Sequence, residues 1–299
     1  MGLTIPLRTQ VFGLVALIVL VAAPFLGALS QTHQILLALA GIGLVGLPHG
    51  AADIWLAGQR GLITSLTSTV VFMLGYVALA AVVVGVWFAA PTISLAVFLT
   101  ISAWHFGGDW ERSGRHILRL TAGVTLLCAP SLFRPEEMTE LYSTLSGEHS
   151  APLVALQQIV FWPAVWAFTL FSLAWNERGD RLSGCIELGA LVLLSAVLPV
   201  VIWFAVYFCA LHSPRHLGAL WTNAPQKRRH SLVIWSITLT LVSLLAGAVL
   251  YASLKMSGAE LSQALIQTGF IGLAALTVPH MALVDGPKSQ RLSTVGGTA

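Results

Sequence analysis

Two histidines stand four positions apart in the stretch YFCALHSPRHLGALW (residues 207–221), which is otherwise almost entirely apolar. They are His212 and His216, and residues at positions i and i+4 lie on one face of an α-helix. Metal-binding H-x-x-x-H helices use this arrangement. Pro214 lies between the two histidines and lacks an N–H, so it predicts a bend in the helix. The pair is therefore a candidate for two ligands of one metal ion.

Three further histidines lie inside apolar runs. They are His49 in GLPHGAADIW, His105 in SAWHFGGDW and His280 in TVPHMALVD. Polar side chains at membrane depth are costly and usually serve a function. The remaining histidines fall at the ends of the runs or in loops, where we expect solvated or interfacial side chains: His33, His116, His149 and His230.

The composition indicates an integral membrane protein. The 299 residues are 57% hydrophobic and only 9% charged, whereas soluble domains carry about a quarter charged residues. Apolar runs of about twenty residues, long enough to cross a hydrocarbon core of ~30 Å, recur from end to end. The expected spans are residues 11–29, 33–56, 68–90, 92–110, 116–133, 152–175, 183–197, 199–220, 231–254 and 261–284. We expect one integral membrane domain over residues 1–299.

The basic residues orient these spans. With the N-terminus inside, 13 of the 15 basic residues fall in inner loops, and only Arg134 and Lys255 fall outside. The predicted fold is thus an all-α polytopic bundle of about ten transmembrane helices (8–10), with both termini in the cytoplasm. Span 11–29 is expected to be an uncleaved anchor, and the acidic segment 134–150 a short surface helix outside. The net charge of +3 forms no basic patch, so no nucleic-acid partner is expected.

The map brings the five histidines of the apolar runs to one depth. At a rise of 1.5 Å per residue, all five lie within about 5–12 Å of the inner surface, on four different spans. A shared metal site explains this coincidence better than independent helix–helix hydrogen bonds. The ligand type does not select the metal, because imidazole suits iron, copper, zinc and nickel alike.

Two aspartates accompany these histidines. Asp53 follows His49 by four residues, and Asp109 follows His105 by four. A metal-bound histidine usually donates its other N–H to a carboxylate, carbonyl or water, so both aspartates are candidates for that supporting role. The alternative is that they mark the inner interface where the spans end. Asp53 precedes further apolar residues, which favours a buried role for it.

The motifs GLPHGAADIW, SAWHFGGDW, LHSPRHLG and VPHMALVD, in this order, resemble the Brp/Blh family of β-carotene-cleaving membrane oxygenases. The resemblance runs from Gly46 to Asp285. It implies a multi-pass protein of the cell (cytoplasmic) membrane with non-haem Fe(II) held by His49, His105, His212 and His216. His280 lies in a family-like motif and is a candidate further ligand.

The resemblance also implies the reaction, which is cleavage of the central double bond of β-carotene by O2 to give two retinal molecules. The lipid bilayer would deliver the C40 hydrocarbon, and a retinal-binding rhodopsin is a functional partner for the product. Aromatic residues near the histidines are candidates for the lining of a substrate tunnel, although aromatics also simply fill membrane cores. They are Trp55, Trp104, Trp203, Phe204, Tyr207 and Phe208.

Other functions compete with this one. A membrane di-iron desaturase needs about eight histidines in several boxes, and only one H-x-x-x-H occurs here. A bis-histidine haem protein or a metal transporter fits the residue types less well. The main alternative is a non-enzymatic carotenoid- or retinal-binding membrane protein that assists a rhodopsin, which would hold pigment without converting it.

Overall fold

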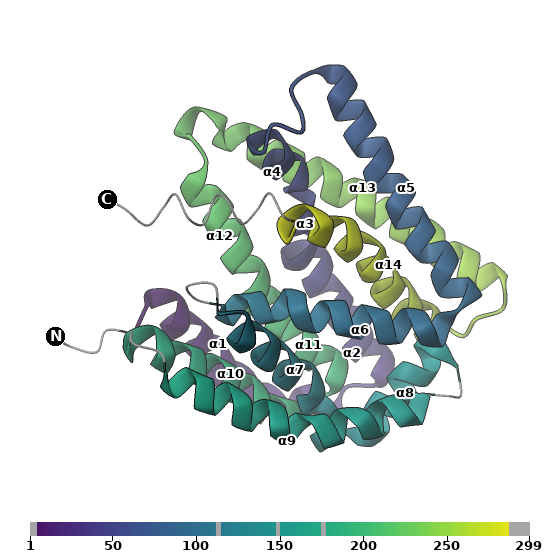
Figure 1. Cartoon of the computed structure of the whole chain (residues 1–299). Helices are drawn as coiled ribbons and strands as arrows, with labels where there is room; N and C mark the ends of the chain where they lie inside the picture. The colour runs from purple at the N-terminus through teal and green to yellow at the C-terminus, as the bar shows by residue number, and fades with distance from the viewer. Residues whose placement is uncertain (1–4, 112–114, 148–149, 175–177, 287–299) are drawn as a thin grey trace. The chain divides into compact units, whose positions relative to one another are not determined.

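The computed structural model describes residues 5–111, 115–147, 150–174 and 178–286, and its described part is helical throughout, without a β-strand (Figure 1). Every apolar run predicted from the sequence lies on a helix or on a helical run with short breaks. Seven stretches in the described residues are long and apolar enough to cross a membrane: Leu7–Ala28, Gln31–Gln59, Leu66–Ala89, His116–Phe133, Ala151–Leu173, Gln226–Met256 and Leu261–Val284. The described part of the chain is thus all-helical, as in a helical membrane protein. Ten crossings, and one domain, stay predictions.

The chain folds as two compact units, each described here by itself. The first unit comprises the residues up to Leu39 and Thr92–His212, and the second comprises Ala40–Pro91 and the residues from Ser213 onward. The helices that lie wholly or mostly in the first unit are α1 (Leu7–Ala28), α2 (Gln31–Gly41), α6 (Pro91–Gly107), η2 (Gly108–Trp110), α7 (His116–Phe133), α8 (Pro135–Ser146), α9 (Ala151–Leu173), α10 (Arg178–Val197), α11 (Val200–Tyr207) and η4 (Phe208–His212).

In the first unit, α7 packs against α9 and α10, and α1 packs against α10 (Figure 1). A buried hydrogen bond of 2.7 Å from the Thr9 hydroxyl to Glu187 joins α1 to α10. The acidic segment after α7 forms the helix α8, as predicted, and its apolar side is buried.

Two glycines let α6 and α7 touch through their backbones. A Cβ atom on Gly107 would lie 1.8 Å from the carbonyl oxygen of Arg119, and a Cβ on Gly123 would lie 1.7 Å from that of Ala103. Small residues allow membrane helices to approach in this way. The crossing fixes the end of α6, two residues after His105.

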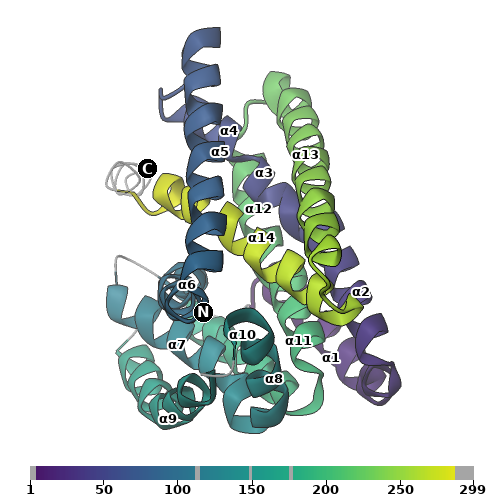
Figure 2. The same cartoon turned by 90° about the vertical axis from the view of Figure 1, so that its right-hand side faces the viewer.

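The second unit contains the helices η1 (Ile42–Gly46), α3 (Leu47–Ala51), α4 (Asp53–Gln59), α5 (Leu66–Ala89), α12 (Ser213–Asn223), η5 (Gln226–Arg228), α13 (Arg229–Met256) and α14 (Leu261–Val284). In Figure 2, α14 lies between α5 and α13 and packs against both. The short helix α3 packs against α12, α13 and α14. At its start, α5 is capped by Ser65, whose hydroxyl accepts the N–H of Ser68 at 3.2 Å.

Both units contain a π-helical segment beside a histidine. η1 ends three residues before His49, and η4 ends at His212 itself. π-helical turns are rare and are often found at functional sites. Pro214, predicted to bend its helix, is the second residue of α12, directly after the η4 segment.

Candidate metal and active site

A buried carboxylate orients a histidine in the first unit. Asp109, in the 3₁₀ turn η2 that follows α6, accepts the Nδ1–H of His212 at 3.1 Å. The Tyr207 hydroxyl donates to the same Oδ2 atom at 2.8 Å. His105 lies next to this pair, with its ring centroid 5.1 Å from that of His212 in an edge-to-face arrangement. Asp109 thus supports a histidine that lies far from it in the sequence, on a later helical segment.

Aromatic rings surround His212 within this unit. Phe208 stacks on the imidazole at a centroid distance of 5.5 Å, and Phe106 meets it edge-on at 5.0 Å. Phe204 stacks on Phe208 at 5.5 Å, and Tyr207 lies 5.8 Å from His212. These rings make a water-poor environment around the imidazole, which strengthens its electrostatic interactions.

Arg119 holds the end of α6 in place. Its Nε–H donates to the carbonyl of Trp104 at 2.6 Å, and a second N–H donates to Glu111 at 3.0 Å. The guanidinium also lies over the Trp104 ring, 4.4 Å from its centroid. Trp104 therefore takes part in a cation–π contact that orders the residue before His105.

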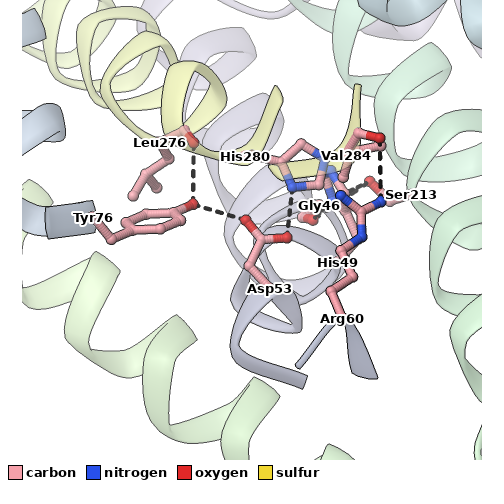
Figure 3. A network of polar contacts seen from close by, with 9 residues as sticks. All are labelled: Gly46, His49, Asp53, Arg60, Tyr76, Ser213, Leu276, His280 and Val284. Atoms are coloured by element: carbon pink, nitrogen blue, oxygen red, sulfur yellow. Dashed lines mark hydrogen bonds and ion pairs between the residues drawn. The ribbon is translucent and has the colours of Figure 1, made fainter. Parts of the chain in front are cut away.

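Three histidines gather in the second unit, and Figure 3 shows two of them, His49 and His280. The centroid of His49 lies 5.3 Å from that of His280 and 5.7 Å from that of His216. His216 and His280 are 6.0 Å apart. The three residues come from α3, α12 and α14, so this part of the site depends on the packing of α3 against the other two helices.

Asp53 is the carboxylate of this cluster, and its partner is His280. The Nδ1–H of His280 donates to Oδ1 of Asp53 at 2.7 Å, and the Tyr76 hydroxyl lies 3.0 Å from Oδ2 (Figure 3). The same hydroxyl lies 3.2 Å from the carbonyl of Leu276. Asp53 is only 4% exposed, which agrees with the buried role expected for it. The helix breaks at Ala52, between α3 and α4, so the spacing of four from His49 is not one regular helical turn.

A backbone carbonyl and a hydroxyl fix His49. Its Nδ1 bonds the carbonyl of Gly46, the last residue of η1, and lies 3.1 Å from the Ser213 hydroxyl. A carbonyl can only accept a hydrogen bond, so Nδ1 carries the proton and Nε2 carries the lone pair. Below this cluster, Arg60 donates to the carbonyl of Val284 at 3.3 Å (Figure 3). Partial burial lowers the pKa of Arg60, and Asp53 and Asp285 oppose that shift.

The hydrogen bonds of three buried histidines suit them to bind a metal ion. His49, His212 and His280 are buried, and each uses Nδ1 to bond a carbonyl or a carboxylate. This is the usual support of a metal-bound imidazole, in which Nε2 provides the lone pair. Of the four ligands implied by the resemblance, His105 and His212 lie in the first unit, and His49 and His216 in the second. The four-ligand set stays a prediction.

Comparison with known proteins identifies the family. The family model described as Beta-carotene 15,15'-dioxygenase matches residues 40–286. A protein named Beta-carotene 15,15'-dioxygenase from an uncultured marine bacterium (66A03) is 34% identical over 269 residues, which cover 85% of this chain and 95% of that protein. The chain belongs to the beta-carotene 15,15'-dioxygenase family. A second member of the family, the Probable beta-carotene 15,15'-dioxygenase Blh of Halobacterium salinarum, is 27% identical over 303 residues, which cover 86% of this chain and 85% of that protein. No solved structure matches the chain.

The histidines and aspartates of both clusters lie inside the part of the chain that matches the dioxygenase family, residues 40–286. The aromatic residues proposed for a tunnel divide into two groups. Phe204, Tyr207 and Phe208 line the surroundings of His212. Trp203 instead donates its indole N–H to the carbonyl of Leu191 at 2.8 Å, and Trp55 packs against the small apolar cluster around Ala52. A tunnel stays a prediction.

Sequence reasoning missed several residues of this dioxygenase-family site. Tyr76 and Ser213 bond the second-unit cluster, and Phe106 contacts His212. Arg119 on α7 is only 9% exposed and orders the end of α6 through the Trp104 carbonyl. An arginine one turn into an apolar helix is the one signal in the sequence that pointed to such a role.

Proposed function

We propose that this protein cleaves the central double bond of β-carotene with O2, giving two molecules of retinal. The observation that carries the proposal is the family match across residues 40–286, which contains every buried histidine–carboxylate pair described above. The names of the relatives state the same activity for those proteins.

In this proposal, non-haem Fe(II) is the cofactor, held by His49, His105, His212 and His216, with His280 as a candidate further ligand. When bound, Fe(II) would supply a centre for O2 that keeps its full 2+ charge, because imidazole ligands are neutral. The protein's part is orientation. Asp109 accepts the Nδ1–H of His212, and Asp53 accepts the Nδ1–H of His280. The hydroxyls of Tyr207 and Tyr76 donate to these two carboxylates in turn. The fixed tautomers aim Nε2 of both rings and limit their rotation.

The aromatic surroundings of His212 have a second part in this proposal. Phe106, Phe204 and Phe208 exclude water and offer flat apolar contacts to a polyene. No named acid or base is needed for the overall reaction, because one O2 and one C=C bond become two C=O bonds. The choice of the central bond then depends on where the protein holds the chain, since catalysis by positioning selects among equivalent double bonds.

The proposal places the protein in the cytoplasmic membrane, with about ten spans and both ends in the cytoplasm. The support is the basic-residue bias and the seven helices suited to crossing a membrane. A site inside the bilayer receives β-carotene without extraction into water. A retinal-binding rhodopsin would use the product.

Expression in a β-carotene-accumulating bacterial host tests the proposed activity. We expect the cells to lose their colour while retinal appears in their extracts. A matched control, His230→Ala, changes a histidine at the start of α13 that lies outside both clusters, and should behave as wild type. Retained β-carotene without retinal, from protein shown to be folded and in the membrane, would contradict the proposal and favour a pigment-binding role.

A further inference from the structure

A small pocket opens in the second unit between α4, the start of α5 and the start of α13. Its volume is about 250 Å³. Its lining includes the polar side chains of Gln59, Arg228 and Ser231 and the indoles of Trp55 and Trp235. In Figure 1, α4 lies beside the first part of α13, and the two helices are in contact. We call it the α4–α13 pocket.

The pocket lies where three stretches suited to crossing a membrane begin or end. They are Gln31–Gln59, Leu66–Ala89 and Gln226–Met256. Gln59 is the last residue of the first stretch, and Arg228 lies near the start of the third. The ends of membrane-crossing helices lie at the level of the lipid head groups, where tryptophan side chains are enriched. The two indoles of the pocket agree with this depth.

Three basic residues follow one another at this end of α13, namely Lys227, Arg228 and Arg229. Arg229 donates its Nε–H to the carbonyl of Ala224 at 3.4 Å and lies over the Trp221 ring, 5.0 Å from its centroid. Arg228 is exposed, and within the part of the chain that the structure describes its side chain makes no hydrogen bond or ion pair. Among the described residues that line the pocket, none is acidic. The pocket therefore offers a guanidinium charge to an anion.

Apolar side chains continue from the pocket along α5 and α13. Val70 follows the pocket residue Thr69, and Ile234 precedes the pocket residue Trp235. Val70 and Ile234 are 48% and 49% exposed. A ligand with its polar end in the pocket can therefore lay an apolar chain against these helices, which is the form of a phospholipid.

We propose that the α4–α13 pocket binds the head group of an anionic phospholipid in the cytoplasmic leaflet. The guanidinium of Arg228 pairs with the phosphate, and the Ser231 hydroxyl and the Gln59 amide donate to head-group oxygens. The predicted orientation, drawn from the basic residues, places this end of α13 in the cytoplasm. Basic pockets between helices on that side of a membrane suit anionic head groups. The proposal does not depend on the reaction that the protein catalyses.

Native mass spectrometry of the detergent-solubilised protein measures this binding. The wild type is titrated with phosphatidylglycerol and with phosphatidylcholine that carry the same acyl chains, so the two lipids differ only in the head group. We expect phosphatidylglycerol to bind about fivefold more tightly, because one basic residue near an anionic surface contributes about 1 kcal/mol. In Arg228→Gln the ratio of the two affinities should fall to about one. The thermal midpoint should not change, since the exposed Arg228 side chain has no partner within the described residues.

Two further variants distinguish a shaped site from diffuse attraction. Lys227→Gln removes a neighbouring charge that does not line the pocket, and should keep the wild-type ratio. Gly58→Leu fills the pocket without changing a charge, since a Cβ on Gly58 meets nothing within 4 Å, and should weaken the binding of phosphatidylglycerol. Equal losses in Lys227→Gln and Arg228→Gln would overturn the inference, and so would wild-type phosphatidylglycerol affinity in Gly58→Leu.

Competition separates a lipid from a soluble anion. Inorganic phosphate and glycerol 3-phosphate carry a phosphate group without acyl chains. At a concentration equal to that of the lipid, we expect neither compound to displace phosphatidylglycerol. Displacement by either one would assign the pocket to a soluble phosphate compound and overturn the lipid assignment. Equal affinities of the wild type for phosphatidylglycerol and phosphatidylcholine would overturn it as well.

Discussion

Replacing Asp53 by asparagine tests the part of the site that the structure defines best. The substitution keeps the shape of the side chain and removes its charge. The Nδ1–H of His280 then donates to a neutral amide oxygen, where it now donates to a carboxylate at 2.7 Å. Tyr76 still has the carbonyl of Leu276 within reach at 3.2 Å, so its hydroxyl keeps an acceptor.

The expected loss follows from these contacts. Hydrogen bonds to charged groups contribute about 1.5–3 kcal/mol, and neutral ones about 0.5–1.5 kcal/mol. The variant therefore loses about 1–2 kcal/mol in the orientation of His280, which is roughly 5- to 30-fold in an equilibrium constant. Losses of about 10- to 100-fold are typical when a partner of a metal-bound histidine is changed. We expect Fe(II) affinity to fall within this combined range, with added Fe(II) partly restoring retinal formation.

Anaerobic Fe(II) titration of purified protein measures this effect, with the thermal midpoint as a check on folding. Tyr76→Phe is the matched variant, because it removes one hydrogen bond to Asp53 and leaves the charge. It should cost less Fe(II) affinity than Asp53→Asn. Glu140→Gln, at an exposed position of α8, controls for loss of a carboxylate and should match wild type. Wild-type Fe(II) affinity in Asp53→Asn would refute the reasoning, and so would an equal loss in Tyr76→Phe.

Three other predictions concern the crossing of α6 and α7, the ligand set and the topology. Gly123→Ala places a Cβ 1.7 Å from the carbonyl oxygen of Ala103, so it should lower the free energy of unfolding by about 3 kcal/mol or more and lower the thermal midpoint. In the control Gly85→Ala the new Cβ meets nothing within 4 Å, so the midpoint should not change. Equal midpoints for the two variants would contradict the close crossing. Alanine at any one of the four predicted ligands (His49, His105, His212 or His216) should abolish retinal formation and lower the amount of bound iron. The control His33→Ala should change neither. Normal turnover in one of the four variants would remove that histidine from the ligand set. A C-terminal reporter fusion should report from the cytoplasm, and a periplasmic signal would overturn the orientation.

Helix positions were predictable because an apolar run of membrane length must satisfy its backbone hydrogen bonds within the segment, as an α-helix does. The stretch 33–56 shows the limit of that reasoning. It lies within one candidate span, Gln31–Gln59, as predicted, but the helix of that span is divided into α2, the π-helical η1, α3 and α4. Hydropathy cannot detect such breaks, because every fragment remains apolar. The break at Ala52 is the reason why the spacing from His49 to Asp53 did not reveal the partner of Asp53.

The candidate site was predictable as a set of residue types and not as a set of bonds. Buried histidines and aspartates in an apolar chain are conspicuous, since burying them is costly without a function. Their partners are not conspicuous. Tyr76 is an ordinary residue in an apolar helix, and it meets Asp53 only because α5 and α4 both pack against α14.

We propose that the chain converts β-carotene and O2 into retinal at an iron site. The most direct measurement is the stoichiometry of the reaction by purified, iron-loaded protein in lipid nanodiscs, with β-carotene, O2 and retinal all quantified. We expect one O2 to be consumed and two retinal molecules to form for each β-carotene lost, and no product to form after a chelator removes the iron. Bound β-carotene that stays intact, or products of unequal length, would contradict it.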